Sequence, residues 1–350
     1  MRLLEIRCAD PMFAWKEHDT ITRMFHRFMS LNKAVGEAIL YAGVECERFD
    51  SPTVLSLAIK YGLSLESQNP QGRTLLMLAA LEGDDELVRC LVENGIGPKE
   101  YDRDNGGFTA LMWAIKGAYL GIVQDLVSAG HGQLEARNHD RRTALMLAAL
   151  WHRADITQYL VEFDQSQLDA KDKKGATPLM LALIGDLQTD FYTSPSNPEE
   201  TDLVVGNKLG VPDKMTPAKE KCIANLETIV KVASQAQLNA RDHQGRTALM
   251  RAIWPGRNSD VELTLKEVLC LMDNSLLDVE VRDNNGESAG AWIRQTMRRS
   301  NWLREDDELC SWEYMLEFIK MKLCETQDRP CLRTAEGLLS PKMAETETDW

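Results

Sequence analysis

The stretch Asn69-Pro-Gln-Gly-Arg-Thr-Leu-Leu-Met-Leu-Ala-Ala80 decides the fold, because its pattern returns four more times along the chain. The other copies begin at Asp104, Asn138, Asp172 and Asp242. Their shared threonines are Thr74, Thr109, Thr143, Thr177 and Thr247, at steps of 35, 34, 34 and 70 residues. A nearly constant period of this length, with a turn before two short helical patterns, is typical of a stacked repeat protein.

Each position of the repeat has a physical reason. Asp or Asn opens a turn by accepting hydrogen bonds from its own backbone, and Gly at the fourth place tolerates a positive φ. The threonine then caps the free N–H groups of a first helix. A second apolar-periodic helix follows, as in residues 84–94, which Gly95 closes. Since no single unit can bury its apolar face, the core must form between units.

These segments resemble ankyrin repeats, whose consensus runs D-x-x-G-x-T-P-L-H-x-A-A, over most of residues 30–325. The resemblance implies an all-α solenoid of helix-turn-helix units. One departure is systematic, because methionine stands where the family usually has histidine: Met77, Met112, Met146, Met180 and Met250. The hydrogen bond of the family's histidine to the threonine is then absent, so we expect a more hydrophobic seam between repeats.

The chain is expected to carry degenerate repeats at both ends. We predict a helical lead-in (1–29), a degenerate capping repeat (30–68), ankyrin-like repeats (69–282), a degenerate helical cap (283–326) and an acidic, disordered tail (327–350). A Pro- and Ser-rich loop at about 186–216 interrupts the fourth regular repeat, which resumes as a helix over 217–233.

Composition and charge narrow the function classes. A net charge of −14 and a pI of about 5.0 argue against nucleic acid or an anionic membrane as the partner, and favour a basic or neutral protein. We also expect a monomer. The eight cysteines are scattered without paired spacing and are predicted to be reduced packing residues, which indicates the cytoplasm or nucleus. No apolar run approaches the roughly 20 residues that span a bilayer.

No pattern in the sequence predicts catalysis. The six histidines show neither HExxH nor ligand spacing to cysteine, so no metal and no cofactor are predicted. Gly286-Glu-Ser-Ala-Gly290 only mimics part of a nucleophile elbow, since it lies in a repeat turn and not after a strand. The alternative class is an enzyme with its site in the insertion or the C-terminal cap.

The candidate binding residues follow from the resemblance, because related proteins bind partners along a concave face formed by turn tips and first helices. Aromatic residues and arginines at these places are typical of interface hot spots. By register the candidates are Arg73, Leu81, Glu82, Phe108, Lys116, Arg142, Leu150, Trp151, Lys173, Lys174, Arg246 and Trp254. Alternatively, Trp151 and Trp254 pack under the flanking insertions as local core. If Trp151 and Arg142 face water, replacing both by Ala abolishes binding and barely changes the melting temperature.

The insertion supplies a second candidate, because Phe191 and Tyr192 in a polar loop could clamp a ligand across the groove. An unconstrained surface loop is the alternative. We therefore predict a non-enzymatic protein-binding module that acts as an adaptor or a stoichiometric inhibitor. A bacterial effector directed at a host, or an immunity-type protein that neutralises a basic toxin, stays open because fold alone does not choose among these roles.

Overall fold

The computed structural model describes residues 40–41, 44, 58, 63–99, 102–130, 133–183, 217–253 and 261–293. The chain forms two compact units, unit 1 (Met1–Ala182) and unit 2 (Leu183–Trp350). The predicted lead-in, most of the first capping repeat, the insertion at 186–216, the end of the C-terminal cap and the tail lie outside the described residues.

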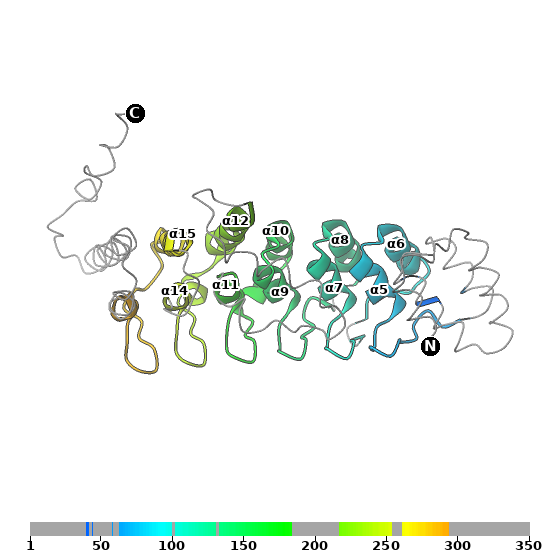
Figure 1. The fold of residues 1–350 in the computed structure, drawn as a ribbon, viewed down its shortest axis with the longest axis horizontal. Coiled ribbons are helices and arrows are strands. Elements are labelled where there is room, and N and C mark those ends of the chain that lie inside the picture. Colours follow the sequence, from blue (N-terminus) through cyan, green and yellow to red (C-terminus); the bar gives the residue numbers. More distant parts are fainter. Residues whose placement is uncertain are drawn as a thin grey trace, which may run out of the picture. The chain divides into compact units, whose positions relative to one another are not determined.

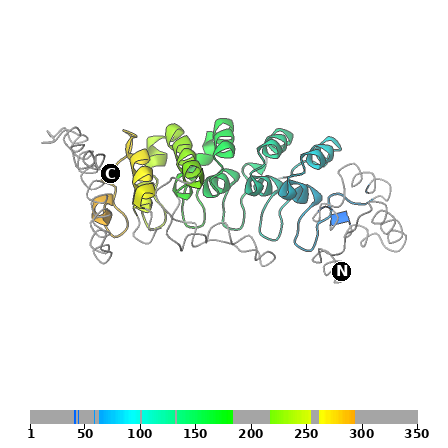
Figure 2. The same cartoon turned by 45° about the horizontal axis from the view of Figure 1, so that its top comes forward.

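Unit 1 is built from helix pairs that follow one another in chain order (Figure 1). The elements are α5 (Leu75–Glu82), α6 (Asp85–Glu93), α7 (Ala110–Gly117), α8 (Leu120–Ala129), α9 (Ala144–Leu150), α10 (Ala154–Phe163), the 3-10 helix η2 (Gln165–Asp169) and α11 (Pro178–Leu181). The first helices α5, α7, α9 and α11 pack in one row, and the second helices α6, α8 and α10 pack in another. Figure 2 shows the turns of unit 1 projecting on one side of these rows.

The threonines start the first helices, as the sequence predicts. Thr74, Thr109, Thr143, Thr177 and Thr247 each accept a hydrogen bond from the backbone N–H of the methionine three residues on, at 3.3–3.4 Å. Helix α5 ends at Gly83, whose φ of 79° lies in the left-handed region. Asp84 then caps α6 by accepting the N–H of Leu87 at 2.8 Å.

The core of unit 1 lies between repeats. The methionines that replace the family's histidine are at most 1% exposed in both units: Met77, Met112, Met146, Met180 and Met250. Leu75, Leu78 and Leu111 are likewise almost fully buried. Full burial of such a side chain contributes about 1.5–3 kcal/mol. The predicted hydrophobic seam is therefore confirmed at these positions.

Unit 2 contains α12 (Pro217–Val232), α13 (Gln235–Leu238), α14 (Ala248–Ala252) and α15 (Val261–Met272). Helix α15 packs against both α12 and α14. The helix predicted over 217–233 is thus confirmed as α12. The first residues of the predicted C-terminal cap repeat the regular turn, since Asp283 accepts the N–H groups of Asn285 and Glu287 before a helical stretch at 289–293.

The part of the chain that the structure describes is helical throughout and forms no strand. Its one bridge joins Arg282 and Ser288 within the last turn. Among these described helices, none combines the length and the apolar content that crossing a membrane requires.

Candidate partner-binding surface

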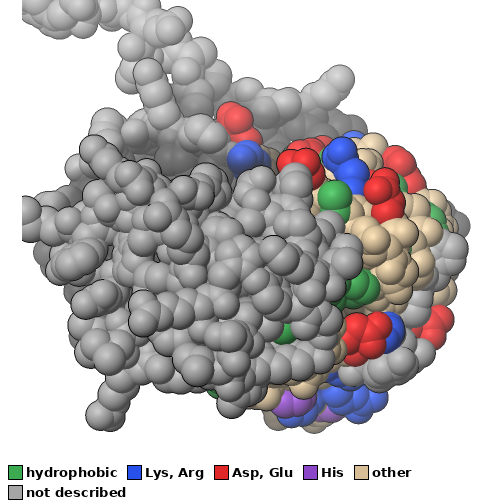
Figure 3. All heavy atoms as spheres, turned by 90° about the vertical axis from the view of Figure 1, so that its right-hand side faces the viewer, with side chains coloured by type: hydrophobic (Ala, Val, Ile, Leu, Met, Phe, Trp, Pro, Cys, Tyr) green, Lys and Arg blue, Asp and Glu red, His purple; other side chains and the backbone are tan. Residues whose placement is uncertain are grey.

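Charge is unevenly distributed over unit 1. The turn segments 68–73, 103–108, 137–142 and 171–176 carry eight Lys or Arg and three Asp. The second helices α6, α8 and α10 instead carry six Asp or Glu and one Arg. Figure 3 shows Lys, Arg and His side chains at its lower margin, the side on which the turns lie in Figure 1. The net charge of −14 therefore does not describe the turn side.

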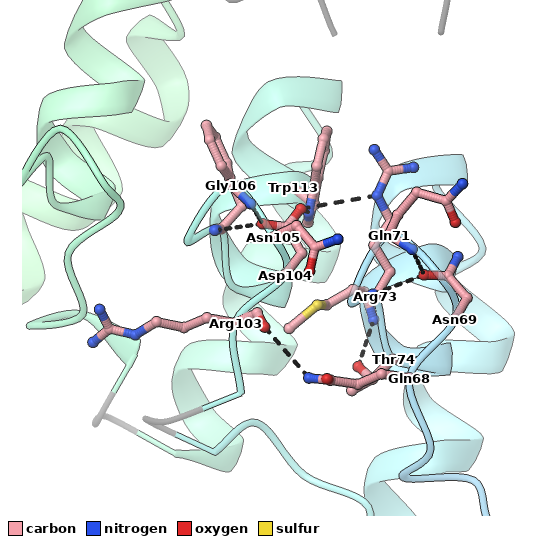
Figure 4. A network of polar contacts seen from close by, with 12 residues as sticks. Gln68, Asn69, Gln71, Arg73, Thr74, Arg103, Asp104, Asn105, Gly106 and Trp113 are labelled. Atoms are coloured by element: carbon pink, nitrogen blue, oxygen red, sulfur yellow. Dashed lines mark hydrogen bonds and ion pairs between the residues drawn. The ribbon is translucent and has the colours of Figure 1, made fainter. Parts of the chain in front are cut away.

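Asp104 holds the second turn together and links it to the first helix. Its Oδ1 accepts the backbone N–H groups of Gly106 and Phe108, both at 2.8 Å. Its Oδ2 accepts the indole N–H of Trp113 at 3.1 Å and lies 3.9 Å from Nε of Arg73 in the preceding turn (Figure 4). The carboxylate is therefore buried and used within the protein.

Successive turns are joined by backbone hydrogen bonds. The N–H of Asn105 donates to the carbonyl of Gln71 at 3.0 Å, and the N–H of Lys173 donates to the carbonyl of Asp140 at 2.9 Å. The side chain of Asn105 also donates to the carbonyl of Pro70 at 3.0 Å. Because each turn is bonded to its neighbour, the side chains on the turns are held in register.

Long polar side chains add a second connection between turns, at the residue before each opening Asp or Asn. Gln68 donates from Nε2 to the carbonyl of Arg103 at 3.3 Å (Figure 4). Arg103 donates from Nη1 to the carbonyl of Arg137, and Arg137 donates to that of Lys171 at 3.0 Å. These three side chains thus join each of the four turns in unit 1 to the next.

Aromatic and cationic side chains meet where the turns join the first helices. The rings of Phe108 and Trp113 lie 5.2 Å apart, and those of Phe108 and Trp151 stack at 6.3 Å. Arg73 lies over Trp113 at 4.4 Å, and Nζ of Lys116 lies 5.2 Å from the same ring. We call these five residues the aromatic cluster. Phe108 and Trp151 are half-buried in it, whereas Trp113 is buried.

The structure brings together part of the predicted site. Arg73, Phe108, Lys116 and Trp151 belong to the aromatic cluster. The remaining described candidates outside the cluster differ in exposure: Leu81 and Glu82 are half-buried, and Lys173 and Lys174 are exposed. In unit 2, Arg246 is held by Asp242 at 2.8 Å. Phe191, Tyr192 and Trp254 lie outside the described residues.

Two candidates do not face water, contrary to the prediction. Arg142 is 5% exposed and lies 3.6 Å from Asp172 of the next repeat, while Leu150 is 7% exposed. Arg142 is drawn inward because Asp172 presents a buried carboxylate there that also accepts two N–H groups of its own turn. Because removing Arg142 would leave the buried carboxylate of Asp172 without this partner, we now expect Arg142→Ala to lower the melting temperature.

Sequence reasoning missed Trp113, Arg103 and Arg137. Trp113 stands nine residues after Asp104, at a position where the first repeat has Leu78, and Trp292 stands nine residues after Asp283. This spacing was the available signal, since both indoles donate to the aspartate of their own turn. Arg103 and Arg137 share the place before the turn's opening residue, a column the motif itself does not include.

The described residues contain little that could perform chemistry. No three of their His, Cys, Asp or Glu side chains are grouped so that they could bind a metal ion. Burial raises the pKa of the Cys222 thiol to about 12, with help from the charge of Glu267, and burial raises that of Cys270 to about 11. Neither thiol ionises near neutral pH, so neither is an activated nucleophile.

Comparison with known proteins identifies the repeat. A family model described as ankyrin repeats in three copies matches residues 40–135 and 117–189. The ankyrin repeat domain of Bcl-3, described as a unique member of the IkappaB protein family, is similar at 22% identity, with a TM-score of 0.51 over 72% of this chain and 92% of that one.

Two further solved structures are similar. For EF0377, an ankyrin repeat protein, the identity is 16% and the TM-score 0.49 over 70% of this chain and 96% of that one. For an ankyrin repeat domain from Acinetobacter baumannii, the identity is 15% and the TM-score is 0.48, over 71% of this chain and 96% of that one. A search of curated proteins finds no match.

Proposed function

Since this chain belongs to the ankyrin repeat family, we propose that it binds another protein through the turns and first helices of unit 1, as an adaptor or a stoichiometric inhibitor and without catalysing a reaction. Ankyrin repeats are general protein–protein interaction modules. The proposal adds the place of binding, the concave side formed by turns and first helices. It also retains the expected monomer and the cytoplasmic location.

The aromatic cluster is the observation that carries the proposal. Phe108 and Trp151 are half-buried and stacked, so they present rigid apolar area that still reaches solvent. Arg73 and Lys116 lie over Trp113 beside them. Aromatic residues and arginine dominate interface hot spots, and a side chain already held in place loses little entropy on binding. The cluster therefore has the composition and the rigidity of a binding anchor.

The expectation of a basic or neutral partner is not retained for this surface. It assumed that the net charge of −14 is spread evenly, whereas the turn segments of unit 1 are rich in Lys and Arg. A partner meets the local field of the surface that it contacts, because charges beyond about 10 Å are screened at ordinary salt. The charge of the partner must therefore be inferred from this edge alone.

The test compares three single variants in affinity capture from a lysate with quantitative mass spectrometry. Phe108→Ala and Trp151→Ala are expected to lose a partner that the wild type retains in stoichiometric amount. Phe163→Ala is the matched control, since Phe163 is 44% exposed but lies on the second helix α10. Retention by all three variants would contradict the proposed surface, and so would a bound small molecule with no retained protein.

Thermal unfolding of the same variants separates binding from folding. Truncating the half-buried Trp151 removes a stacking pair of about 0.5–1.5 kcal/mol, so the folded state is expected to persist. If Trp151→Ala instead unfolds the protein, Trp151 is local core, as the alternative in the sequence holds. Phe108→Ala then carries the test alone.

A further inference from the structure

The turn edge of unit 1 carries an excess of positive charge, whereas the second helices α6, α8 and α10 carry an excess of negative charge. We define the basic turn edge by its exposed or half-buried cations: Arg103, Arg137, Arg141, Lys171, Lys173 and Lys174. His139 is exposed on the same edge. The only carboxylate that faces solvent within these turn segments is that of Asp140.

The positive charge is in excess because two of the three turn aspartates are buried and bonded within the protein. Asp104 and Asp172 are buried, accept the N–H groups of their own turns and lie near Arg73 and Arg142. These contacts balance two of the cations against two of the acids. Arg103, Arg137, Arg141 and Lys173 stay exposed or half-buried on this edge, where the described turn segments hold one solvent-facing carboxylate, that of Asp140.

The arginines of the edge are held in position without being neutralised. Arg103 and Arg137 donate to backbone carbonyls of the following turns, and Arg137 also donates to the carbonyl of Arg141. Within the described part of the chain, no ion pair with a carboxylate involves any of these three arginines. A guanidinium has five N–H donors, so those beyond the carbonyl contacts can bind an anion, and Arg matches a carboxylate in a bidentate way.

The opposite side of unit 1 repels what this edge attracts. Helices α6, α8 and α10 carry six carboxylates and one arginine, Arg89, which pairs with Asp125 at 3.0 Å. An anionic partner is therefore steered to the turn side.

The repeat spacing sets the length scale of the ligand. Packed helices lie about 8–10 Å apart, so successive turns offer a cationic group at about that interval. A peptide in the extended polyproline II conformation rises about 3.1 Å per residue with three residues per turn, so every third side chain lies on the same face and meets a new turn. A long nucleic acid is repelled by a chain whose net charge is −14, whereas a short peptide meets mainly the local charge of the edge.

We propose that the basic turn edge binds an extended acidic segment of the partner protein, with Asp or Glu at about every third residue. This rests on the proposed function, because it names the partner chemistry for the turn side of the same surface. The aromatic cluster anchors the partner beside the edge, and the edge selects the segment by its charge. Because Arg103 and Arg137 are already fixed by hydrogen bonds, they lose little entropy when a peptide binds. Their fixed positions let the edge distinguish peptides by the spacing of their acidic residues as well as by their charge.

The experiment measures fluorescence anisotropy of labelled synthetic peptides on the purified full chain. One peptide carries Glu at every third residue, a second has the same composition with the Glu residues contiguous, and a third has Gln in place of Glu. The spaced peptide is expected to bind best, the Gln peptide not at all, and binding should weaken as salt rises. Equal binding of the spaced and contiguous peptides, or none at low salt, overturns the proposal.

A matched pair of variants locates the binding. Arg141→Gly combined with Lys173→Gln removes two charges from the edge, and the first change restores the residue that the other turns carry at this left-handed position, where Arg141 has a φ of 62°. Arg89→Gln combined with Lys231→Gln removes two exposed charges from α6 and α12. The edge variant is expected to weaken peptide binding about tenfold and the control less than about twofold.

The remaining outcomes separate this inference from the proposed function. Equal weakening by both double variants, or tighter binding of a labelled single-stranded oligonucleotide than of the spaced peptide, overturns the acidic-segment proposal. If Trp151→Ala still loses a captured partner while no peptide binds, the protein-binding function stands and only the assignment of an acidic segment fails. If peptide binding holds but no partner is retained by the wild type, the proposed function fails instead.

Discussion

Asp104 offers the sharpest test of how the turns support the surface. We predict that Asp104→Ala lowers the free energy of unfolding by about 3 kcal/mol, because it removes two hydrogen bonds from turn N–H groups and leaves the buried indole N–H of Trp113 without its acceptor. Each part-buried turn bond contributes about 0.5–1.5 kcal/mol, and an unsatisfied buried donor costs about 1–3 kcal/mol.

Asp104→Asn divides this loss into its parts. The amide oxygen can still accept the turn N–H groups, as Asn69 does for Gln71 and Arg73 at 3.0 and 2.8 Å. Its NH₂ group cannot accept from the indole, so the Trp113 contact is lost. The expected cost is about 1–2 kcal/mol. The double variant Asp104→Asn/Trp113→Phe should be about 1 kcal/mol more stable than the sum of the two single changes predicts, because Trp113→Phe removes the unsatisfied indole donor.

Urea unfolding followed by circular dichroism measures all these variants, with an unchanged m-value as the sign that cooperativity is kept. Circular dichroism is chosen because Trp113→Phe itself alters tryptophan fluorescence. The reasoning is refuted if Asp104→Ala and Asp104→Asn destabilise equally, or if Asp104→Ala costs less than about 1 kcal/mol.

Two other predictions concern backbone geometry and burial. Gly107→Ala should cost at least about 1 kcal/mol more than Gly95→Ala: both have φ near +80°, but a Cβ at Gly107 would lie 2.8 Å from the backbone N of His139, while Gly95 has open space. Equal losses in urea unfolding would contradict this difference. Burial raises the pKa of Cys222 to about 12 and of Cys270 to about 11, so the unfolded chain, near 9.0, ionises first. The two thiols stabilise the folded state fully below about pH 9, and this contribution is lost as the pH rises towards their pKa values in the folded protein. Between neutral pH and about pH 10, the free energy of unfolding of the wild type should therefore fall more than that of the double variant Cys222→Ala/Cys270→Ala. Parallel losses in the two proteins would contradict this prediction.

The elements of the fold were predictable because their causes are local. A threonine cap acts on the N–H three residues on, and the turn carboxylate or amide acts on N–H groups two and four residues on. Five near-identical copies of that pattern made the helix starts readable, and the recurrent Met77-type positions made the buried seam readable. The third turn shows the limit of the motif, since Arg141 occupies the left-handed place that Gly fills in the others.

The site was less predictable because its contacts join different repeats. Arg73 and Arg142 occupy the same register position and were predicted to behave alike, yet Arg73 lies over the Trp113 ring and Arg142 is buried against Asp172. Nothing in the local pattern distinguishes them. The difference depends on which residue the next repeat presents, Trp113 after Asp104 or Leu181 after Asp172.

The sequence by itself determined the repeat, the helix caps and the turn conformation, since these depend on residues within a few positions of one another. Only the tertiary structure decided which charges remain on the surface. Arg73 meets Asp104, Arg142 meets Asp172, and Phe108 meets Trp151 through stacking of whole repeats. Burying the turn carboxylates in those contacts leaves a positive edge on an acidic chain, and net charge cannot reveal this because it counts buried and exposed groups alike.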